Sequence, residues 1–292
     1  SDWSAVRTVK TDITLPTVVF TAEPSGTIND PRPTWEWEGT DARSGIGHYL
    51  VQLDDEPSFT TRDTMWTPAS NLADGEHILR VQAVDVVGNV SEWLVSDAVV
   101  IDTIPPAVPG IPEPEETPTK LTTPAWTWKA SAGAASYNVY LDDEPIANVT
   151  EPEFTTADYA TFGVAALAEG RHNMQVTALD EWGNESDMSG TGHVLVDLTP
   201  PEVPELDPLP PFTKADMIRF VWTAVDGAVS YDLEGIANGV KIPVYTLDIA
   251  AKVTGDVVAT RVRAYDSVGN VSEWSAAVST IVDRTGPTTT AV

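Results

Sequence analysis

The sequence predicts an all-β protein made of tandem β-sandwiches, and three observations lead to that prediction. Short segments that alternate apolar with polar residues follow one another along the chain, as half-buried strands do. Turns rich in Pro and Gly separate these segments at short intervals, which is typical of β-sandwiches. One long pattern also occurs three times, and repetition of this kind indicates repeated domains.

The repeated pattern centres on the motif Asp-x-x-Gly-Asn, which begins at Asp85, Asp180 and Asp266. Alternating residues precede each copy and a second extended run follows it, so we expect a β-hairpin that turns at the motif. A Ser follows each Asn at a constant spacing. An Asp and then a Pro come later, again at constant spacing, and these aspartates are Asp102, Asp197 and Asp283.

The repeat is roughly ninety residues long, an ordinary domain size. We expect repeat 1 at residues 13–104, repeat 2 at 105–198 and repeat 3 at 199–286. Residues 1–12 align with the end of repeat 3 without a gap, so we expect them to be the last strand of a preceding repeat. Residues 287–292 are expected to begin a following repeat, although arbitrarily chosen ends could match by accident. The sequence is then a piece of a longer array.

The strands of repeat 1 are expected around residues 18–20, 34–37 and 48–53, before the hairpin. Alternation along 48–53 puts its aromatic and aliphatic side chains on one face. Repeat 2 has the same plan after an extended, Pro-rich linker. Its Ala-rich stretch 157–168 is interrupted by Gly163, which favours a loop or one short helical turn. Repeat 3 lacks the Asp-Asp-Glu-Pro turn of the other two, so we expect its middle to be remodelled.

Two aromatic positions are shared by the repeats and are expected in the cores. A Trp stands shortly before the third expected strand of each repeat, and a second aromatic residue precedes it by two positions, on the same face. An exposed Trp could instead stack on a sugar, but the sequence shows no exposed aromatic cluster. The core residues are Trp37, Trp128 and Trp222, preceded by Trp35, Trp126 and Phe220.

Charge and composition exclude several functions. The formal net charge of −28 repels nucleic acid and anionic membrane surfaces and attracts cations. The chain has no Cys, so neither disulfides nor thiol chemistry are available. No apolar run approaches the ~20 residues of a membrane span, and no membrane insertion is expected.

Five motifs recur in one order, and repeat 3 departs from them at its middle strands. They are Trp-x-Trp, Tyr-x-Val-x-Leu-Asp, Asp/Glu-Gly, Val-x-Ala-x-Asp-x-x-Gly-Asn-x-Ser and Asp-x-x-x-Pro. Over nearly the whole chain they resemble the bacterial immunoglobulin-like (fibronectin III-like) repeats of large surface adhesins. The resemblance implies three tandem immunoglobulin-like β-sandwich domains in an extended array, secretion by Gram-negative bacteria, and calcium that stiffens the junctions. Similar modules serve as spacers in secreted polysaccharide-degrading enzymes, so the resemblance defines the fold better than the function.

Carboxylates are expected to meet at the junctions, because such a sandwich is entered at one pole and left at the other. Converging carboxylates repel one another unless something neutralises them, and Ca²⁺ takes about six to eight oxygen ligands. Alternatively, the hairpin aspartates only cap their turns and the linker aspartates only punctuate the chain. Repeat 2 has no Asp in its loop 129–136, so its junction should be the weakest or the most different. The expected groups are Asp12 with Asp85 and Asp41, Asp102 with Asp180, and Asp197 with Asp266 and Asp226.

Catalytic signatures are absent from the sequence. The four histidines are scattered without metal-ligand spacing, and no phosphate-binding loop or nucleophile elbow occurs. We therefore expect no enzyme, but an extracellular or cell-surface extender segment of a bacterial adhesin, stiffened by cations and in contact with neighbouring repeats. The alternative is an accessory or glycan-binding module of a secreted polysaccharide-active enzyme. A third possibility is a filament subunit whose residues 1–12 dock on another chain.

Overall fold

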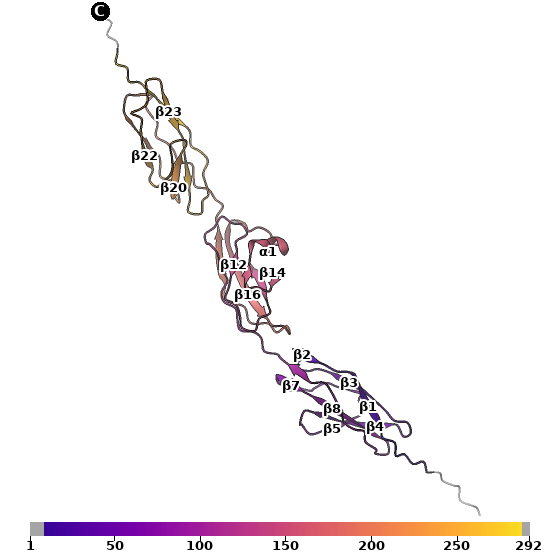
Figure 1. Ribbon diagram of the computed structural model, residues 1–292. Helices are drawn as coiled ribbons and strands as arrows, with labels where there is room; N and C mark the ends of the chain where they lie inside the picture. The colour runs from indigo at the N-terminus through magenta and orange to yellow at the C-terminus, as the bar shows by residue number, and fades with distance from the viewer. Residues whose placement is uncertain (1–8, 288–292) are drawn as a thin grey trace, which may run out of the picture.

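The computed structural model describes residues 9–287 and consists almost entirely of strands. Three groups of sheets follow one another along an elongated molecule (Figure 1). Each group encloses its own cluster of buried apolar side chains, so the chain has three separate cores rather than one. In the part of the chain that the structure describes, no helix is long and apolar enough to cross a membrane.

The first group, called unit 1, comprises residues 17–101. β3 pairs with β1 and β6, β4 pairs with β5 and β8, and β10 lies between β2 and β7. Side chains that alternate along β3, β4 and β8 fill the space between the sheets. The strands are β1 (Thr17–Ala22), β2 (Gly26–Ile28), β3 (Trp35–Thr40), β4 (Ile46–Leu53), β5 (Phe59–Thr61), β6 (Met65–Trp66), β7 (Gly75–His77), β8 (Leu79–Asp85), β9 (Leu94–Val95) and β10 (Val99–Ile101).

Unit 2 comprises residues 113–196 and packs a three-stranded sheet against a four-stranded one. The Ala-rich stretch contains the short helix α1 (Thr156–Thr161), which is the short helical turn that the sequence offered as one of two alternatives. The helix begins with a capping box between Thr155 and Asp158. Buried Tyr159 attaches this helix to the core. The strands are β11 (Glu113–Pro114), β12 (Trp126–Thr127), β13 (Ser136–Leu141), β14 (Glu144–Val149), β15 (Glu153–Phe154), β16 (Gly170–Leu179) and β17 (Gly192–Val196).

Unit 3 comprises residues 212–282. Its middle lacks the Asp-Asp-Glu-Pro turn, but β20 pairs with two neighbours as β4 does in unit 1, so the expected remodelling does not extend to the strand pairing. β19 pairs with β22, β20 pairs with β21 and β24, and β25 lies between β18 and β23. Asp232 on β20 is buried and accepts hydrogen bonds from Tyr265 and Arg263. The strands are β18 (Phe212–Thr213), β19 (Met217–Val221), β20 (Ser230–Leu233), β21 (Ala237–Val240), β22 (Val244–Asp248), β23 (Val257–Thr260), β24 (Val262–Tyr265) and β25 (Val278–Val282).

The same aromatic pair anchors each core. Trp37 packs edge-on against Tyr49, with ring centroids 5.8 Å apart, and both side chains are buried. The pairs Trp128–Tyr137 and Trp222–Tyr231 repeat this arrangement at 5.5 Å and 5.3 Å. The expected core aromatics are therefore buried in all three units, including the preceding residues Trp35, Trp126 and Phe220.

The hairpins are only partly as expected. The turn forms in every unit, but the run after it is mostly irregular, and β9 has two residues. Serine hydroxyls take the place of part of the strand ladder: the amide of Ala83 donates to Ser91 Oγ and the amide of Leu79 donates to Ser96 Oγ. Because the hydroxyls satisfy these buried amides, the chain does not need a full strand there. The same bonds join Ala178 to Ser186, Val176 to Ser189, Ala264 to Ser272 and Val262 to Ser275.

The expected terminal segments remain predictions. Residues 1–8 and 288–292 lie outside the described part of the chain, and residues 9–12 form no strand. The physical reason is that a strand needs a neighbour to pair with, and the described residues contain no sheet of a preceding repeat. The boundaries at residues 104, 198 and 286 likewise stay predictions, although each of the three cores lies within one predicted repeat.

Candidate functional site at the repeat junctions

The hairpin aspartates organise their own turns. Asp85 Oδ1 accepts hydrogen bonds from the backbone amides of Val87, Gly88 and Asn89 at 2.9, 2.6 and 2.8 Å. Gly88 takes a positive φ of 98°, which a glycine adopts without strain. Asp180 and Asp266 accept from their own turns in the same way. The turn-capping role that the sequence left open is therefore present in all three units.

The Asn of each turn connects the turn to the incoming linker. Asn184 Nδ2 donates to Asp180 Oδ2 at 2.8 Å and to the backbone carbonyl of Asp102 at 2.9 Å. We call this pair of bonds the linker clasp. Asn270 forms it with Asp266 and the carbonyl of Asp197, at 2.9 Å each. Asn89 forms it with Asp85 at 2.7 Å and the carbonyl of Asp12 at 3.3 Å.

The linker aspartates thus meet the next turn through their backbone carbonyls. Their carboxylates fold back on the linker instead: Asp102 Oδ1 accepts the amide of Ile104 at 3.1 Å, and Asp197 Oδ1 accepts that of Thr199 at 3.1 Å. Asp12 does the same with Thr14 at 2.9 Å. Sequence reasoning missed the clasp, although the constant position of the Asn after the hairpin Asp was a signal for it.

Each of the two linkers between units is also held by the unit that it leaves. Asp74 Oδ1 accepts both the amide and the hydroxyl of Thr103 at 2.8 Å. After unit 2, the Glu169 carboxylate accepts the hydroxyl of Thr199. The two linkers between units are therefore hydrogen-bonded to both of their neighbours, which restricts the angle between successive units.

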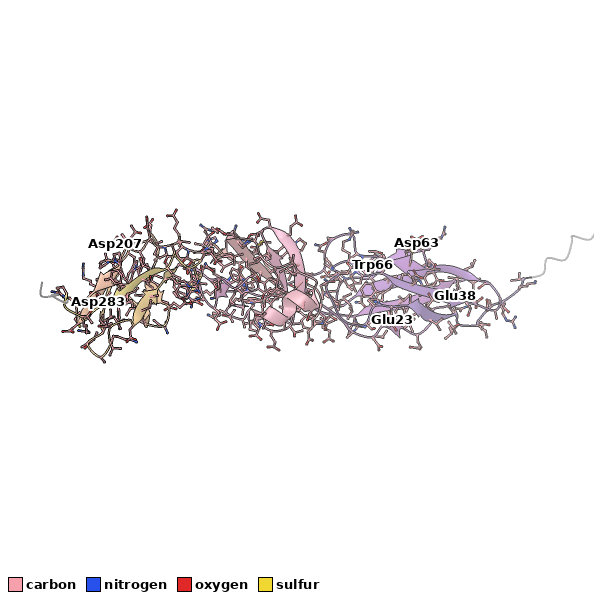
Figure 2. The ribbon with its side chains drawn as sticks, turned by 90° about the horizontal axis from the view of Figure 1, so that it is seen from above. Glu23, Glu38, Asp63, Trp66, Asp207 and Asp283 are labelled. Carbon is pink, nitrogen blue, oxygen red and sulfur yellow. The ribbon has the colours of Figure 1, made fainter. Side chains whose placement is uncertain are left out.

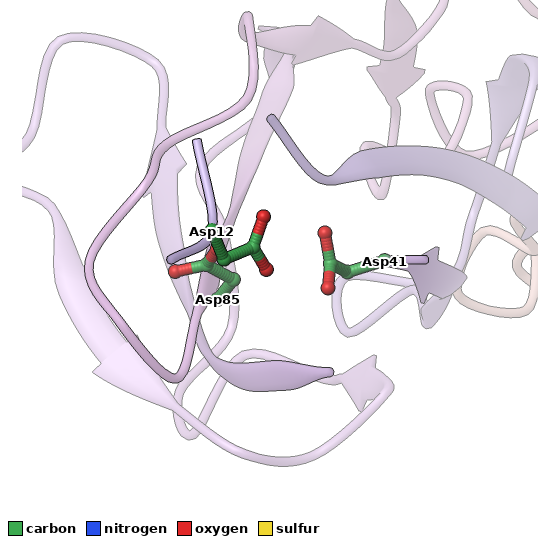
Figure 3. A group of neighbouring side chains, drawn as sticks. All are labelled: Asp12, Asp41 and Asp85. Atoms are coloured by element: carbon green, nitrogen blue, oxygen red, sulfur yellow. The ribbon is translucent and has the colours of Figure 1, made fainter. Parts of the chain in front are cut away.

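Three carboxylates converge at the entry to unit 1. Oxygen atoms of Asp12, Asp41 and Asp85 all lie within 4.8 Å of one another, and in Figure 3 the Asp41 carboxylate faces the other two across a gap. Asp41 Oδ2 is fixed by the amides of Arg43, Ser44 and Gly45. Asp12 Oδ2 and Asp41 Oδ1 are buried and have no hydrogen-bond partner among residues 9–287. Orphaned acceptors in a cluster of this kind fit a hard cation.

All three carboxyls are held in the charged form. The backbone hydrogen bond from Thr14 lowers the pKa of Asp12, and those from Arg43 and Gly45 lower the pKa of Asp41. Burial raises the pKa of Asp85, but the hydrogen bonds from Asn89 outweigh it and the net pKa is lowered. Lys10 and Arg43 line the open cavity beside the cluster, whose volume is about 700 Å³. Within residues 9–287 neither forms an ion pair with these aspartates.

The other junctions differ from the first. Across the described residues, Asp12, Asp41 and Asp85 are the one group of three or more potential metal ligands. Asp226 is exposed and does not join Asp197 and Asp266 in such a group, so the expected three-carboxylate site at unit 3 does not form. Asp102 and Asp180 meet through Asn184. Trp182, which is 39% exposed, lies beside Ile104 and Pro105 of the linker there.

No protein-family model matches the chain. Exoglucanase B of Cellulomonas fimi is 28% identical over 295 residues, which cover 93% of this chain and 26% of the enzyme. The chain therefore spans about a quarter of the length of this relative.

Solved structures show weaker likenesses. Fibronectin(III)-like modules of Clostridium thermocellum CbhA match 62% of this chain and 94% of theirs at 16% identity and a TM-score of 0.37. The chicken CNTN1 FN1–FN3 domains match 92% of this chain and 99% of theirs at 13% identity and a TM-score of 0.33. At these scores the likenesses do not bear on function. With its repeated motifs and its successive sandwiches, this chain has a fibronectin III-like, immunoglobulin-like β-sandwich fold.

Proposed function

We propose that this chain is a non-catalytic spacer that holds other parts of a longer secreted protein at a set separation and direction. The linker clasp is the observation that carries the proposal. It recurs at all three Asp-x-x-Gly-Asn turns, and between units it joins a side chain of one unit to the backbone that leaves the previous one. Domains connected by flexible linkers would not require hydrogen bonds of this kind.

Two of the four histidines are engaged in structural contacts. His77 Nδ1 lies 2.8 Å from Asp54 Oδ2, and its Nε2 lies 2.9 Å from the carbonyl of Ala73. His172 repeats this arrangement with Asp142 and the carbonyl of Ala168. Both imidazoles connect a turn to a loop, which is a structural role and supports a chain without catalysis of its own.

The similarity to Exoglucanase B favours a polysaccharide-active enzyme as the longer protein, because it extends over nearly all of this chain. The spacer would then separate the domains of such an enzyme outside the cell, with a glycan as a possible ligand. The second candidate is an extender of a surface adhesin, which the repeated motifs resemble. The full-length gene decides between them: a neighbouring catalytic domain supports the enzyme, and many further repeats support the adhesin.

Calcium is proposed as a ligand at the entry to unit 1. Asp12, Asp41 and Asp85 would hold it, and its charge would offset the repulsion between the three carboxylates and tie the linker to the sandwich. The orphaned oxygens of Asp12 and Asp41 support this fit. At the other two junctions the described residues include no buried carboxylate oxygen without a partner, so calcium there, although predicted from the sequence, lacks this support.

Small-angle scattering of the whole chain tests the spacer proposal. A stiff spacer gives one sharp maximum dimension that does not change with concentration. A broad distribution of dimensions, as expected for free joints, would refute it. Titration calorimetry with Ca²⁺ tests the cation independently: one class of sites that Asp41→Asn removes is expected, and the absence of heat in the parent chain would rule out the calcium site.

A further inference from the structure

Units 2 and 3 are joined by a second hydrogen bond, next to the linker clasp. Lys120 Nζ donates to the backbone carbonyl of Gly269 at 3.0 Å. Gly269 belongs to the Asp-x-x-Gly-Asn turn of unit 3, so the ammonium group of one unit reaches the turn that also clasps the linker. A Cβ placed on Gly269 would lie 3.1 Å from Lys120 Nζ, so the glycine permits this close approach.

Units 1 and 2 meet at the same place with a different side chain. Lys120 follows Thr119, whose carbonyl accepts the amide of the linker residue Asp197. Asn29 follows Ile28, whose carbonyl accepts the amide of Asp102 in the same way. Asn29 is therefore the counterpart of Lys120, and a Cβ on Gly183 would lie 3.4 Å from its Nδ2. The neutral Asn29 approaches the next turn, whereas the charged Lys120 forms a hydrogen bond to it.

The backbone positions Lys120 firmly. The side chain of Thr119 is buried, its amide donates to Leu195, and its Oγ1 accepts the amide of Leu121. These bonds fix the backbone next to Lys120 and leave only the conformation of its side chain to vary. Its ammonium group lies at the turn that contains Asp266, and the preceding residue Thr119 is hydrogen-bonded to the amide of Asp197. Within residues 9–287 the ammonium group forms no direct ion pair, so it acts on these carboxylates at longer range. An ammonium ion at such a turn lowers the repulsion between the carboxylates.

We propose that Lys120 is a resident cation that locks unit 3 onto unit 2, so that this joint keeps its angle without a divalent ion. The entry to unit 1, with its three carboxylates, is then the cation-dependent part of the chain, and the joint between units 1 and 2 is the weaker of the two inner joints. This inference rests on the proposed spacer function and states which positively charged group stabilises which joint.

The experiment uses the absence of Cys, which allows one spin label to be placed in each unit of the full chain. Thr150→Cys and Ser279→Cys lie at exposed positions in units 2 and 3. The distribution of distances between the two labels is measured by pulsed electron resonance, with Ca²⁺ and with chelator, in the parent chain and in Lys120→Met, Lys120→Arg and Lys214→Met. Lys214, an exposed residue after Thr213 in unit 3, is the matched control because it lies away from this joint.

The parent chain is expected to give a narrow distribution that neither Ca²⁺ nor chelator changes. Lys120→Met should raise the share of other interdomain distances roughly two- to five-fold, the range that follows from the strength of an exposed charged contact. Lys120→Arg should restore the narrow distribution and Lys214→Met should leave it unaltered.

Equal distributions for Lys120→Met and the parent chain would overturn the role of Lys120. A parent distribution that narrows when Ca²⁺ is added would overturn it as well, because the joint would then need a divalent ion. A parent distribution that is broad under every condition would instead refute the spacer function, so the two failures are distinguishable.

Discussion

Asn184 Nδ2 lies 2.9 Å from the carbonyl oxygen of Asp102, and this hydrogen bond crosses the boundary between units 1 and 2. The same nitrogen donates to Asp180 Oδ2 within its own turn. One side chain therefore holds both the shape of the turn and the direction from which the linker arrives. Any change in the turn is expected to change the joint, and the reverse also holds.

Replacing Asn184 with Ala is expected to loosen the joint between units 1 and 2. The change removes two hydrogen bonds, each worth about 0.5–1.5 kcal/mol, and leaves the carbonyl of Asp102 without this donor. Labels at exposed Thr60→Cys and Thr150→Cys should show a broader distance distribution. The exposed Asn238 provides the control: Asn238→Ala should leave the distribution unchanged. An unchanged distribution in Asn184→Ala would show that the clasp does not set the joint.

Replacing Trp37 with Ala is expected to destabilise unit 1 by about 3–5 kcal/mol, as for other large-to-small changes at buried aromatic residues. Its side chain is 1% exposed and packs on Tyr49. Because each unit has its own core, calorimetry should show one transition at lower temperature and two that stay in place. A common shift of all transitions would mean that the units unfold together. Trp93→Ala, at a 37% exposed position of the same unit, should have a much smaller effect.

Calcium is expected to stabilise unit 1 through Asp12, Asp41 and Asp85. At a free concentration of about one hundred times Kd, binding to the folded state adds about 2.7 kcal/mol to the free energy of unfolding. The melting temperature of unit 1 should rise with Ca²⁺, and Asp41→Asn should abolish the rise. Asp226→Asn is the control, since the exposed Asp226 lies outside the cluster. A rise that persists in Asp41→Asn would place the ion elsewhere.

Units 1 and 2 are expected to lose stability as the pH rises through the folded-state pKa values of His77 and His172. Burial lowers the pKa of each imidazole. The hydrogen bonds of His77 to Ala73 and Asp54, and those of His172 to Asp142 and Ala168, outweigh burial, and both net pKa values are raised. A raised folded-state pKa gives stability that is fully present below the ordinary value of about 6.5 and is lost at higher pH.

Unit 3 provides an internal control for this pH dependence. Its counterpart of His77 is Val258, which pairs with Thr280 as His77 pairs with Val99. Thermal unfolding between pH 5 and pH 9 should therefore show this decline for the transitions of units 1 and 2 only. His77→Gln should remove it from unit 1. A decline that survives the substitution would assign it to another group.

The sandwiches and their cores could be predicted because they depend on short-range patterns. Alternation places Tyr49 and Val51 on one face whatever the rest of the chain does, and the structure buries both. Position within the repeat also showed that Trp37, Trp128 and Trp222 share an environment. Neither inference needed distances between residues that are far apart in the sequence.

The contacts at the junctions were harder to predict from the sequence, because the spacing of residues does not say which atom of a residue faces its partner. Asp102 was expected to present its carboxylate to Asp180, but it presents its backbone carbonyl to Asn184. The carboxylates of Asp12, Asp41 and Asp85 do meet, while Asp226 stays apart. Lys120 carries no local signal at all, since its partner Gly269 follows 149 residues later.

The two-sided hold on the linkers has a mechanical consequence. Thr103 is tied to the unit behind it through Asp74, while the neighbouring carbonyl of Asp102 is tied to the unit ahead through Asn184. A pulling force along the array therefore acts directly on these hydrogen bonds, because the linker between these units has no loose segment that could extend first. We expect such a chain to resist extension until the hydrogen bonds at a joint break, and to regain its length when the same bonds re-form after the load is released.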